Sequence, residues 1–130
     1  MKLKIGSDIE NLHVIENGVD EIMNKIGIEK DRYGHILVAT MEAVNNAIVH
    51  GNSMDERKNV NICLEYDKMN FIVRVKDQGM GFNHESVPDP TSPDNIENIH
   101  GRGVFLMKRL SDDIGFNDTG NEVIMKFKIE

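Results

Sequence analysis

The sequence has little cysteine, proline and aromatic content, and it has no excess of positive charge. Its 130 residues include one Cys, three Pro, no Trp, two Tyr and five Phe. Because Cys63 stands alone, an internal disulfide and a metal site built from several cysteines are excluded. The formal net charge of −7 argues against a nucleic-acid binder, which needs a basic surface to displace counterions. It also argues against docking on anionic membranes.

Long hydrophobic runs are missing too. No run approaches the roughly 18 apolar residues of a membrane-spanning helix, and Met1 to Asp8 lack the apolar core of a secretory signal peptide. We therefore expect a cytoplasmic protein. A hydrophobic fraction of 39% with 28% charged residues is typical of a globular domain. The length is that of one domain, which we expect to span residues 1–130.

Apolar residues recur with the periods of helices and strands. In the first half, alternation predicts a strand over residues 2–5, and a helix capped by Ser7 follows and ends near Gly27. A second helix is expected from about Glu29 to His50. The later elements are predicted at residues 60–66 and 71–76 (a hairpin), 103–110 (a helix), and 114–118 and 122–129 (a last hairpin).

The stretch between Gly79 and Gly103 has little apolar periodicity and contains all three prolines. A segment of this kind inside a compact domain is usually functional or disordered. The order of the surrounding elements predicts an α/β sandwich (α+β), with helices layered on one face of a mixed, mostly antiparallel sheet.

Three stretches carry polar residues or glycines that these patterns do not require. In the first, Glu42 and Asn46 are four residues apart, so they share one side of the second helix among apolar neighbours. Buried polar groups need partners. If both line a cleft, the carboxylate can act as a base and the amide oxygen as a ligand for a hard cation. From the spacing alone, a partly solvated helix edge is the ordinary alternative.

The other two stretches combine glycines with a charged residue. Asp77-Gln78-Gly79-Met80-Gly81-Phe82 follows a strand, and its glycines allow a sharp bend and the close approach of a ligand. A tight turn is the alternative. Gly101-Arg102-Gly103-Val104 precedes a helical pattern, where free N–H groups, the helix dipole and Arg102 favour phosphate. The alternative is a loop-to-helix junction with a solvated arginine.

Together, and in this order, the stretches resemble the motifs of the GHKL (Bergerat-fold) ATP-binding family. Residues 42–51 are similar to its N box, residues 77–82 to its first glycine box and residues 101–107 to its second. Within the family, Met41 to Asn52 most resembles the anti-sigma-factor serine/threonine kinases. The resemblance covers nearly the whole chain and implies a Bergerat-type fold with an ATP lid at about residues 83–100.

The resemblance implies a role for each motif residue. Asn46 would hold the Mg²⁺ that bridges the ATP phosphates, and Glu42 would be the general base. Asp77 would accept a hydrogen bond from the adenine amino group. The remaining motif residues would let the chain pass under the nucleotide or cradle its phosphates: Gly79, Gly81, Gly101, Arg102, Gly103 and Val104.

The same resemblance implies an ATP-dependent protein serine/threonine kinase that doubles as an anti-sigma factor in bacterial partner switching. It would bind a sigma factor in one state and phosphorylate a small anti-sigma-factor antagonist protein in another. Members of this group dimerise, which leaves a homodimer open for this chain. Asn45 and Asn121 stand where the family often has Thr, and residues 83–100 contain no Lys or Arg.

Three alternatives stay open at this point. The lack of cations in the expected lid favours a non-catalytic ATP-binding regulatory module of the same fold. A detached catalytic domain of a histidine kinase is disfavoured, because no dimerisation helix with an acceptor histidine precedes residue 1. An α/β domain without any ligand would require all three motifs to be accidental.

Overall fold

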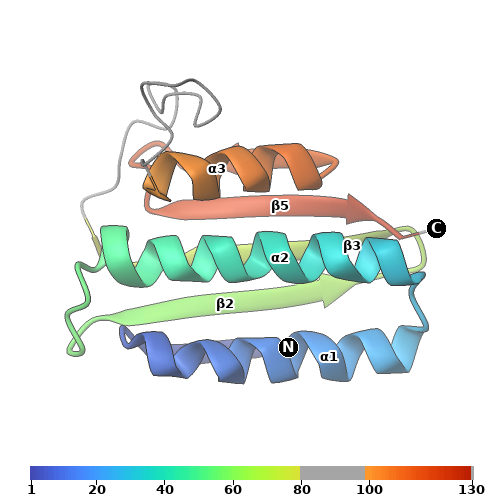
Figure 1. The fold of residues 1–130 in the computed structure, drawn as a ribbon, viewed down its shortest axis with the longest axis horizontal. Coiled ribbons are helices and arrows are strands. Elements are labelled where there is room, and N and C mark those ends of the chain that lie inside the picture. Colours follow the sequence, from blue (N-terminus) through green and yellow to red (C-terminus); the bar gives the residue numbers. More distant parts are fainter. Residues whose placement is uncertain (80–98, 130) are drawn as a thin grey trace.

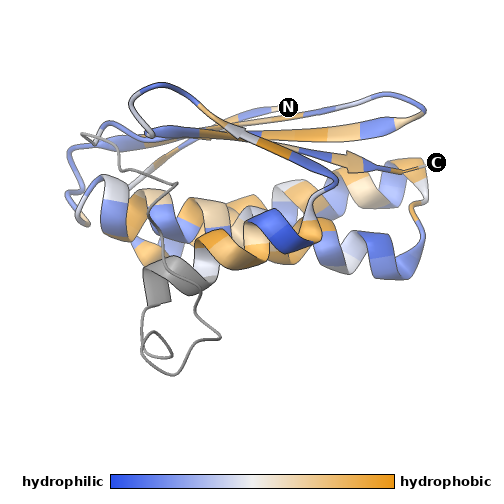
Figure 2. Ribbon diagram, turned by 90° about the horizontal axis from the view of Figure 1, so that it is seen from above, coloured by the Kyte–Doolittle hydropathy of each residue, from blue (hydrophilic) through white to orange (hydrophobic). Residues whose placement is uncertain are grey.

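Two layers make up the fold, a sheet and a set of helices that covers one of its faces (Figures 1 and 2). The computed structural model describes residues 1–79 and 99–129, with the side chains of residues 99–102 left out. In chain order the elements are β1 (Lys2–Gly6), η1 (Ile9–Asn11), α1 (Leu12–Ile26), α2 (Lys30–Asn46), η2 (Ala47–Gly51), β2 (Asn59–Tyr66), β3 (Asn70–Lys76), α3 (Ile99–Leu110), β4 (Asp113–Phe116) and β5 (Glu122–Lys128).

The five described strands follow the order β1-β2-β3-β5-β4. We expected a mixed, mostly antiparallel sheet, and every pairing among these strands is antiparallel. The register places Leu64 opposite Val73 and Val73 opposite Met125. All three side chains are fully buried, because alternate residues of a strand point to the same face and this face lies against the helices. The predicted α+β sandwich is therefore confirmed.

The helical layer is centred on α2, which lies between α1 and α3 (Figure 1). Its buried Ile36 and Val44 join Ile15 of α1 and Met107 of α3 in the core. Figure 2 shows the helices lying along one face of the sheet, with hydrophobic residues in both layers. No helix in the described part of the chain is long and apolar enough to span a membrane.

The first helical region has one capping residue that differs from the prediction and one that agrees with it. The prediction that Ser7 caps this helix is wrong. Asp8 is the cap of η1, and its Oδ1 accepts a hydrogen bond from the N–H of Glu10 at 2.9 Å. Ser7 is fully buried, and its hydroxyl donates instead to the carbonyl of Lys58 at 2.7 Å. At the other end Gly27, with φ of 63°, ends α1 as predicted, since this left-handed conformation favours glycine.

The remaining elements appear where the sequence placed them, with shifted ends. The second helix continues past Asn46 as the π-helical turn η2, and α3 begins at Ile99, four residues before the predicted start. Residues 80–98 lie outside the described part, so most of the expected lid, residues 83–100, is not placed.

Candidate nucleotide-binding site

The C-terminal end of α2 widens into the π-helical turn Ala47–Gly51. The N–H of Asn52 donates to the carbonyl of Ala47 at 2.8 Å, and the N–H of Met54 donates to that of Ile48 at 2.8 Å. Ser53 and Met54 follow with φ of 52° and 58°, in the left-handed region that non-glycine residues rarely adopt. Single π turns are frequent at functional sites. This one brings Gly51 directly beside Asp77.

Gly51 and Gly79 allow two distant segments to meet backbone against backbone. A Cβ atom on Gly51 would lie 2.2 Å from Asp77 Oδ2, and one on Gly79 would lie 2.0 Å from the Gly51 carbonyl oxygen. A side chain at Gly79 would therefore push the segment after β3 away from the end of α2, and a side chain at Gly51 would displace the Asp77 carboxylate. Within this junction Asp77 Oδ1 accepts the N–H of Gly79 at 2.7 Å, and the Asp77 N–H donates to the Asn121 carbonyl at 2.9 Å.

The Asp77 carboxylate lies in a partly desolvated position. Burial raises its pKa above 3.8, while the hydrogen bond from the Gly79 N–H and the charge of Lys58 act in the opposite direction. A carboxylate that has lost part of its hydration while keeping lone pairs free is a suitable acceptor for a ligand's N–H group.

Glu42 and Asn46 lie together where α3 passes α2. A Cβ atom on Gly103 would be 3.0 Å from Glu42 Oε2, 3.0 Å from Asn46 Nδ2 and 3.2 Å from Asn46 Oδ1. The shared helix face inferred from their spacing is thus present, and Gly103 is the residue of α3 that lets the two helices come this close. The neighbouring Val104 is buried in the core.

The Asn46 carboxamide is the most unusual polar group of the site. It is only 9% exposed, and neither its oxygen nor its nitrogen has a hydrogen-bond partner in the described part of the chain. An unsatisfied buried polar group costs about 1–3 kcal/mol, which makes the Asn46 amide a candidate ligand-binding group. An amide oxygen beside a carboxylate fits a hard cation such as Mg²⁺, which prefers oxygen ligands.

A cleft extends from Asn46 to Asp77 and contains about 500 Å³ of empty space, part of it open to solvent. Its walls are mostly apolar, as in typical small-molecule sites. His50 lines it as well, and partial burial lowers the pKa of the imidazole. The other lining residues come from α2, η2, β3, α3 and the β4–β5 hairpin: Ala43, Ala47, Gly51, Val75, Met107, Phe116, Gly120, Asn121, Glu122 and Val123.

The structure thus brings the predicted residues together in two groups. Asn46 and Asp77 line one cleft, and Glu42, Asn46 and Gly103 meet at its α3 side. Gly81 lies outside the described residues. Gly101 and Arg102 belong to the first turns of α3, but nothing is described beyond their backbone.

Sequence reasoning missed the apolar walls and one buried polar residue. Ala43 and Ala47 are four residues apart and line the cleft together with Asn46. This pair of small residues on one helix face was an available signal for space beside the helix. Asn52 is fully buried although it follows a helix stop. Nothing in its local pattern distinguishes it from an exposed turn residue.

Comparison with known proteins agrees with this geometry. Residues 5–127 match the family model described as the histidine kinase-like ATPase domain. The anti-sigma F factor of Clostridium perfringens is 30% identical over an alignment of 135 positions, which covers 99% of this chain and 96% of the relative. The serine-protein kinase RsbW of Oceanobacillus iheyensis is 25% identical over an alignment of 134 positions, which covers 98% of this chain and 85% of the relative. The RsbW of Staphylococcus epidermidis is 26% identical over 121 residues, covering 88% and 76%.

Proposed function

Because the chain belongs to the histidine kinase-like ATPase family, we propose that it is an ATP-binding anti-sigma factor and protein serine/threonine kinase. Its substrate would be a small anti-sigma-factor antagonist. The names of the relatives support both activities, since they are a serine-protein kinase and an anti-sigma F factor. The observation that carries the proposal is the buried Asn46 amide, which has no hydrogen-bond partner among the described residues. It lies beside Glu42 and lines the same cleft as Asp77.

The Asp77 end of the cleft would bind adenine. The flat apolar faces of a purine suit walls formed by Val75 and Met107. The Asp77 carboxylate would accept a hydrogen bond from the exocyclic amino group, which distinguishes adenine from purines that carry a carbonyl there. Gly79 and Gly51 allow the backbone to pack closely around Asp77, because side chains at either residue would displace its carboxylate.

The Asn46 end would bind the phosphates. The Asn46 amide oxygen would hold Mg²⁺, which, when bound, neutralises charge on the phosphoryl groups. Glu42, beside it, would accept the proton of the attacking serine or threonine hydroxyl at its carboxylate. The first turns of α3, with Gly101, would offer unpaired backbone N–H groups to phosphate oxygens.

The same proposal extends to the partners. In the cytoplasm, a sigma factor and the antagonist would compete for binding to the protein. Once phosphorylated, the antagonist would no longer compete. A homodimer is part of this proposal by analogy with the group that the motifs resemble.

A phosphotransfer assay tests the kinase activity directly. The protein is incubated with Mg²⁺, ATP labelled at the γ-phosphate and a small anti-sigma-factor antagonist from the same organism. Wild type should label the antagonist, and Glu42→Gln should lower the rate by about 10²- to 10⁴-fold, the range of general-base contributions. Glu21→Gln, at an exposed position of α1, is the matched control and should behave as wild type.

Binding distinguishes the kinase from the non-catalytic module. Both predict heat on titration with ADP, whereas only the kinase predicts label transfer. Wild type that binds ADP but transfers no label, with Glu42→Gln equally inactive, would favour the regulatory module. Wild type that binds no adenine nucleotide would reject both.

A further inference from the structure

Asn52 connects three chain segments near Asp77, at the end of the cleft where adenine would bind (the base end). It is a polar residue with 0% exposure, and none of the roles described above involves it. Its side-chain oxygen accepts the N–H of Gln78 at 2.7 Å. Its side-chain nitrogen donates to Ser7 Oγ at 2.9 Å and to the Asn59 carbonyl at 3.0 Å. One carboxamide therefore bonds to the segment after β1, the start of β2 and the segment after β3.

Both chemical halves of this carboxamide are in use. An aspartate would keep the acceptor for Gln78 but lose both donors, and an alanine would remove all three of these hydrogen bonds. The backbone of Asn52 is fixed as well, because its N–H donates to the Ala47 carbonyl of the π turn. Asn52 thus ties the end of α2 to the loop that follows β3.

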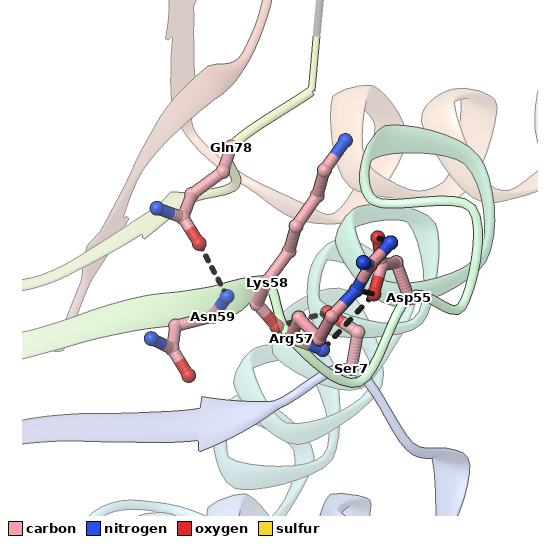
Figure 3. Close-up of polar contacts among 6 residues, drawn as sticks. All are labelled: Ser7, Asp55, Arg57, Lys58, Asn59 and Gln78. Atoms are coloured by element: carbon pink, nitrogen blue, oxygen red, sulfur yellow. Dashed lines mark hydrogen bonds and ion pairs between the residues drawn. The ribbon is translucent and has the colours of Figure 1, made fainter.

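The contacts around Asn52 extend the connection. Ser7 accepts a hydrogen bond from Asn52. Figure 3 shows the next two contacts: the Ser7 hydroxyl donates to the carbonyl of Lys58 at 2.7 Å, and Gln78 Oε1 accepts the N–H of Asn59 at 2.5 Å. Gln78 is therefore held twice, through its backbone by Asn52 and through its side chain by Asn59.

Gln78 lies between the two residues that shape the base end of the cleft. Asp77 would present its carboxylate to adenine, and Gly79 packs on the Gly51 carbonyl while its N–H bonds Asp77 Oδ1. The Gln78 N–H is the polar group between them, and Asn52 is its partner. Movement of Gln78 would shift the carboxylate and release the packing of Gly79.

We infer that Asn52 is a positioning residue for base selectivity: through the Gln78 N–H it sets the place of the Asp77 carboxylate. This role depends on the proposed function, because it requires that Asp77 accepts the adenine amino group. It adds that the discrimination between adenine and other purines depends on a residue that does not contact the nucleotide.

The test compares ADP with IDP, which carries a carbonyl in place of the amino group, by titration calorimetry. Wild type should prefer ADP by about 10- to 100-fold, the usual strength of a charge-assisted hydrogen bond. In Asn52→Ala the preference should fall to about 3-fold or less through weaker ADP binding, with the IDP affinity little changed. Ser7→Ala, which leaves the Gln78 contact in place, is the matched control and should keep the wild-type preference.

A purely structural role would give a different result. It would lower the melting temperature or the fraction of binding-competent protein while leaving the ADP-to-IDP ratio unchanged, and that outcome in Asn52→Ala would overturn the inference. Failure of the proposed function is distinguishable, because wild type itself would then bind no ADP or show no preference.

A second variant and a measurement on wild type cover the case in which Asn52→Ala does not fold. Asn52→Asp keeps the acceptor for the Gln78 N–H and should retain most of the ADP preference despite lower stability. In wild type, hydrogen exchange of the Gln78 amide should be slow without nucleotide. Rapid exchange there would contradict a fixed Asn52–Gln78 contact.

Discussion

Replacing Gly79 by alanine should damage both stability and nucleotide binding, because the new methyl group would collide with backbone. The Cβ atom would lie 2.0 Å from the Gly51 carbonyl oxygen and 2.6 Å from its carbon, whereas ordinary contacts begin at 3.4 Å. The two segments would have to separate by more than about 1 Å, since a backbone carbonyl in a packed junction cannot rotate away as a flexible side chain can.

The expected magnitude follows from this displacement. Overpacking costs typically about 1–3 kcal/mol, and a clash with backbone belongs at the upper end. For a domain of this length, about 3 kcal/mol corresponds to a fall in melting temperature of roughly 10 °C. A shift of 1 Å in a binding group can cost about 10²-fold in function, so the affinity for ADP should fall by a similar factor. Thermal melts and titration calorimetry measure the two effects.

The control is Gly34→Ala in α2. A Cβ atom at Gly34 meets nothing within 4 Å, and alanine is favoured over glycine inside a helix by about 1 kcal/mol. This variant should be slightly more stable than wild type and should bind ADP unchanged. If Gly79→Ala has the melting temperature and the ADP affinity of wild type, the close packing of the two segments is refuted.

Three further predictions concern the phosphate end, the base end and the core. Gly103→Ala should lower the rate of phosphotransfer about 10-fold or more, because its methyl group would press on Glu42 and Asn46 at 3.0 Å. The affinity for ADP without Mg²⁺ should change little. Rate assays and calorimetry measure the two effects, and an unchanged rate of phosphotransfer would contradict the prediction. Because burial raises the pKa of Asp77, ADP affinity should decline on acidification at a higher pH than an exposed aspartate would give. Since the raised pKa belongs to the folded state, the free protein should gain stability as pH falls through that pKa toward 3.8, and both trends should vanish in Asp77→Asn, measured by calorimetry and denaturant titration. Phe127→Ala, at a fully buried position opposite Phe71, should cost about 3–5 kcal/mol, whereas a surface substitution such as Lys126→Ala should stay within about 0.5 kcal/mol in the same unfolding assay.

The strands and helices could be predicted because each has one buried face. Val73 and Val75 alternate with exposed Arg74 and Lys76, and that period of two is visible in the sequence. The partner of a strand is not visible in this way. The pairing of β3 with β5 depends on packing between segments far apart in the chain, which no local pattern encodes.

The cap at Ser7 shows where local reasoning failed. A serine before a helical pattern is a typical N-cap, but its hydroxyl bonds to Lys58, 51 positions away. The neighbouring Asp8 takes over the cap. A long-range contact thus outweighed a local preference, and only the tertiary structure reveals it.

The sequence could predict that Glu42 and Asn46 lie close together, but not how the segments around them are packed. The spacing of Glu42 and Asn46 placed both on one face, as observed. That Gly51 and Gly79 pack against each other was hidden, since the π turn leaves no mark in the apolar periodicity of the helix. That the Asn46 amide has no hydrogen-bond partner within the part of the chain that the structure describes appears only once the surrounding side chains are placed.

The most direct measurement is titration calorimetry of wild type and Asn46→Ala with ATP, with and without Mg²⁺. Wild type should bind ATP, and Mg²⁺ should strengthen the binding. Asn46→Ala should bind ATP without Mg²⁺ about as well as wild type and should gain little from the metal, because its ligand is gone. Folded wild-type protein that releases no heat with adenine nucleotides, or an undiminished effect of Mg²⁺ in Asn46→Ala, would contradict the account.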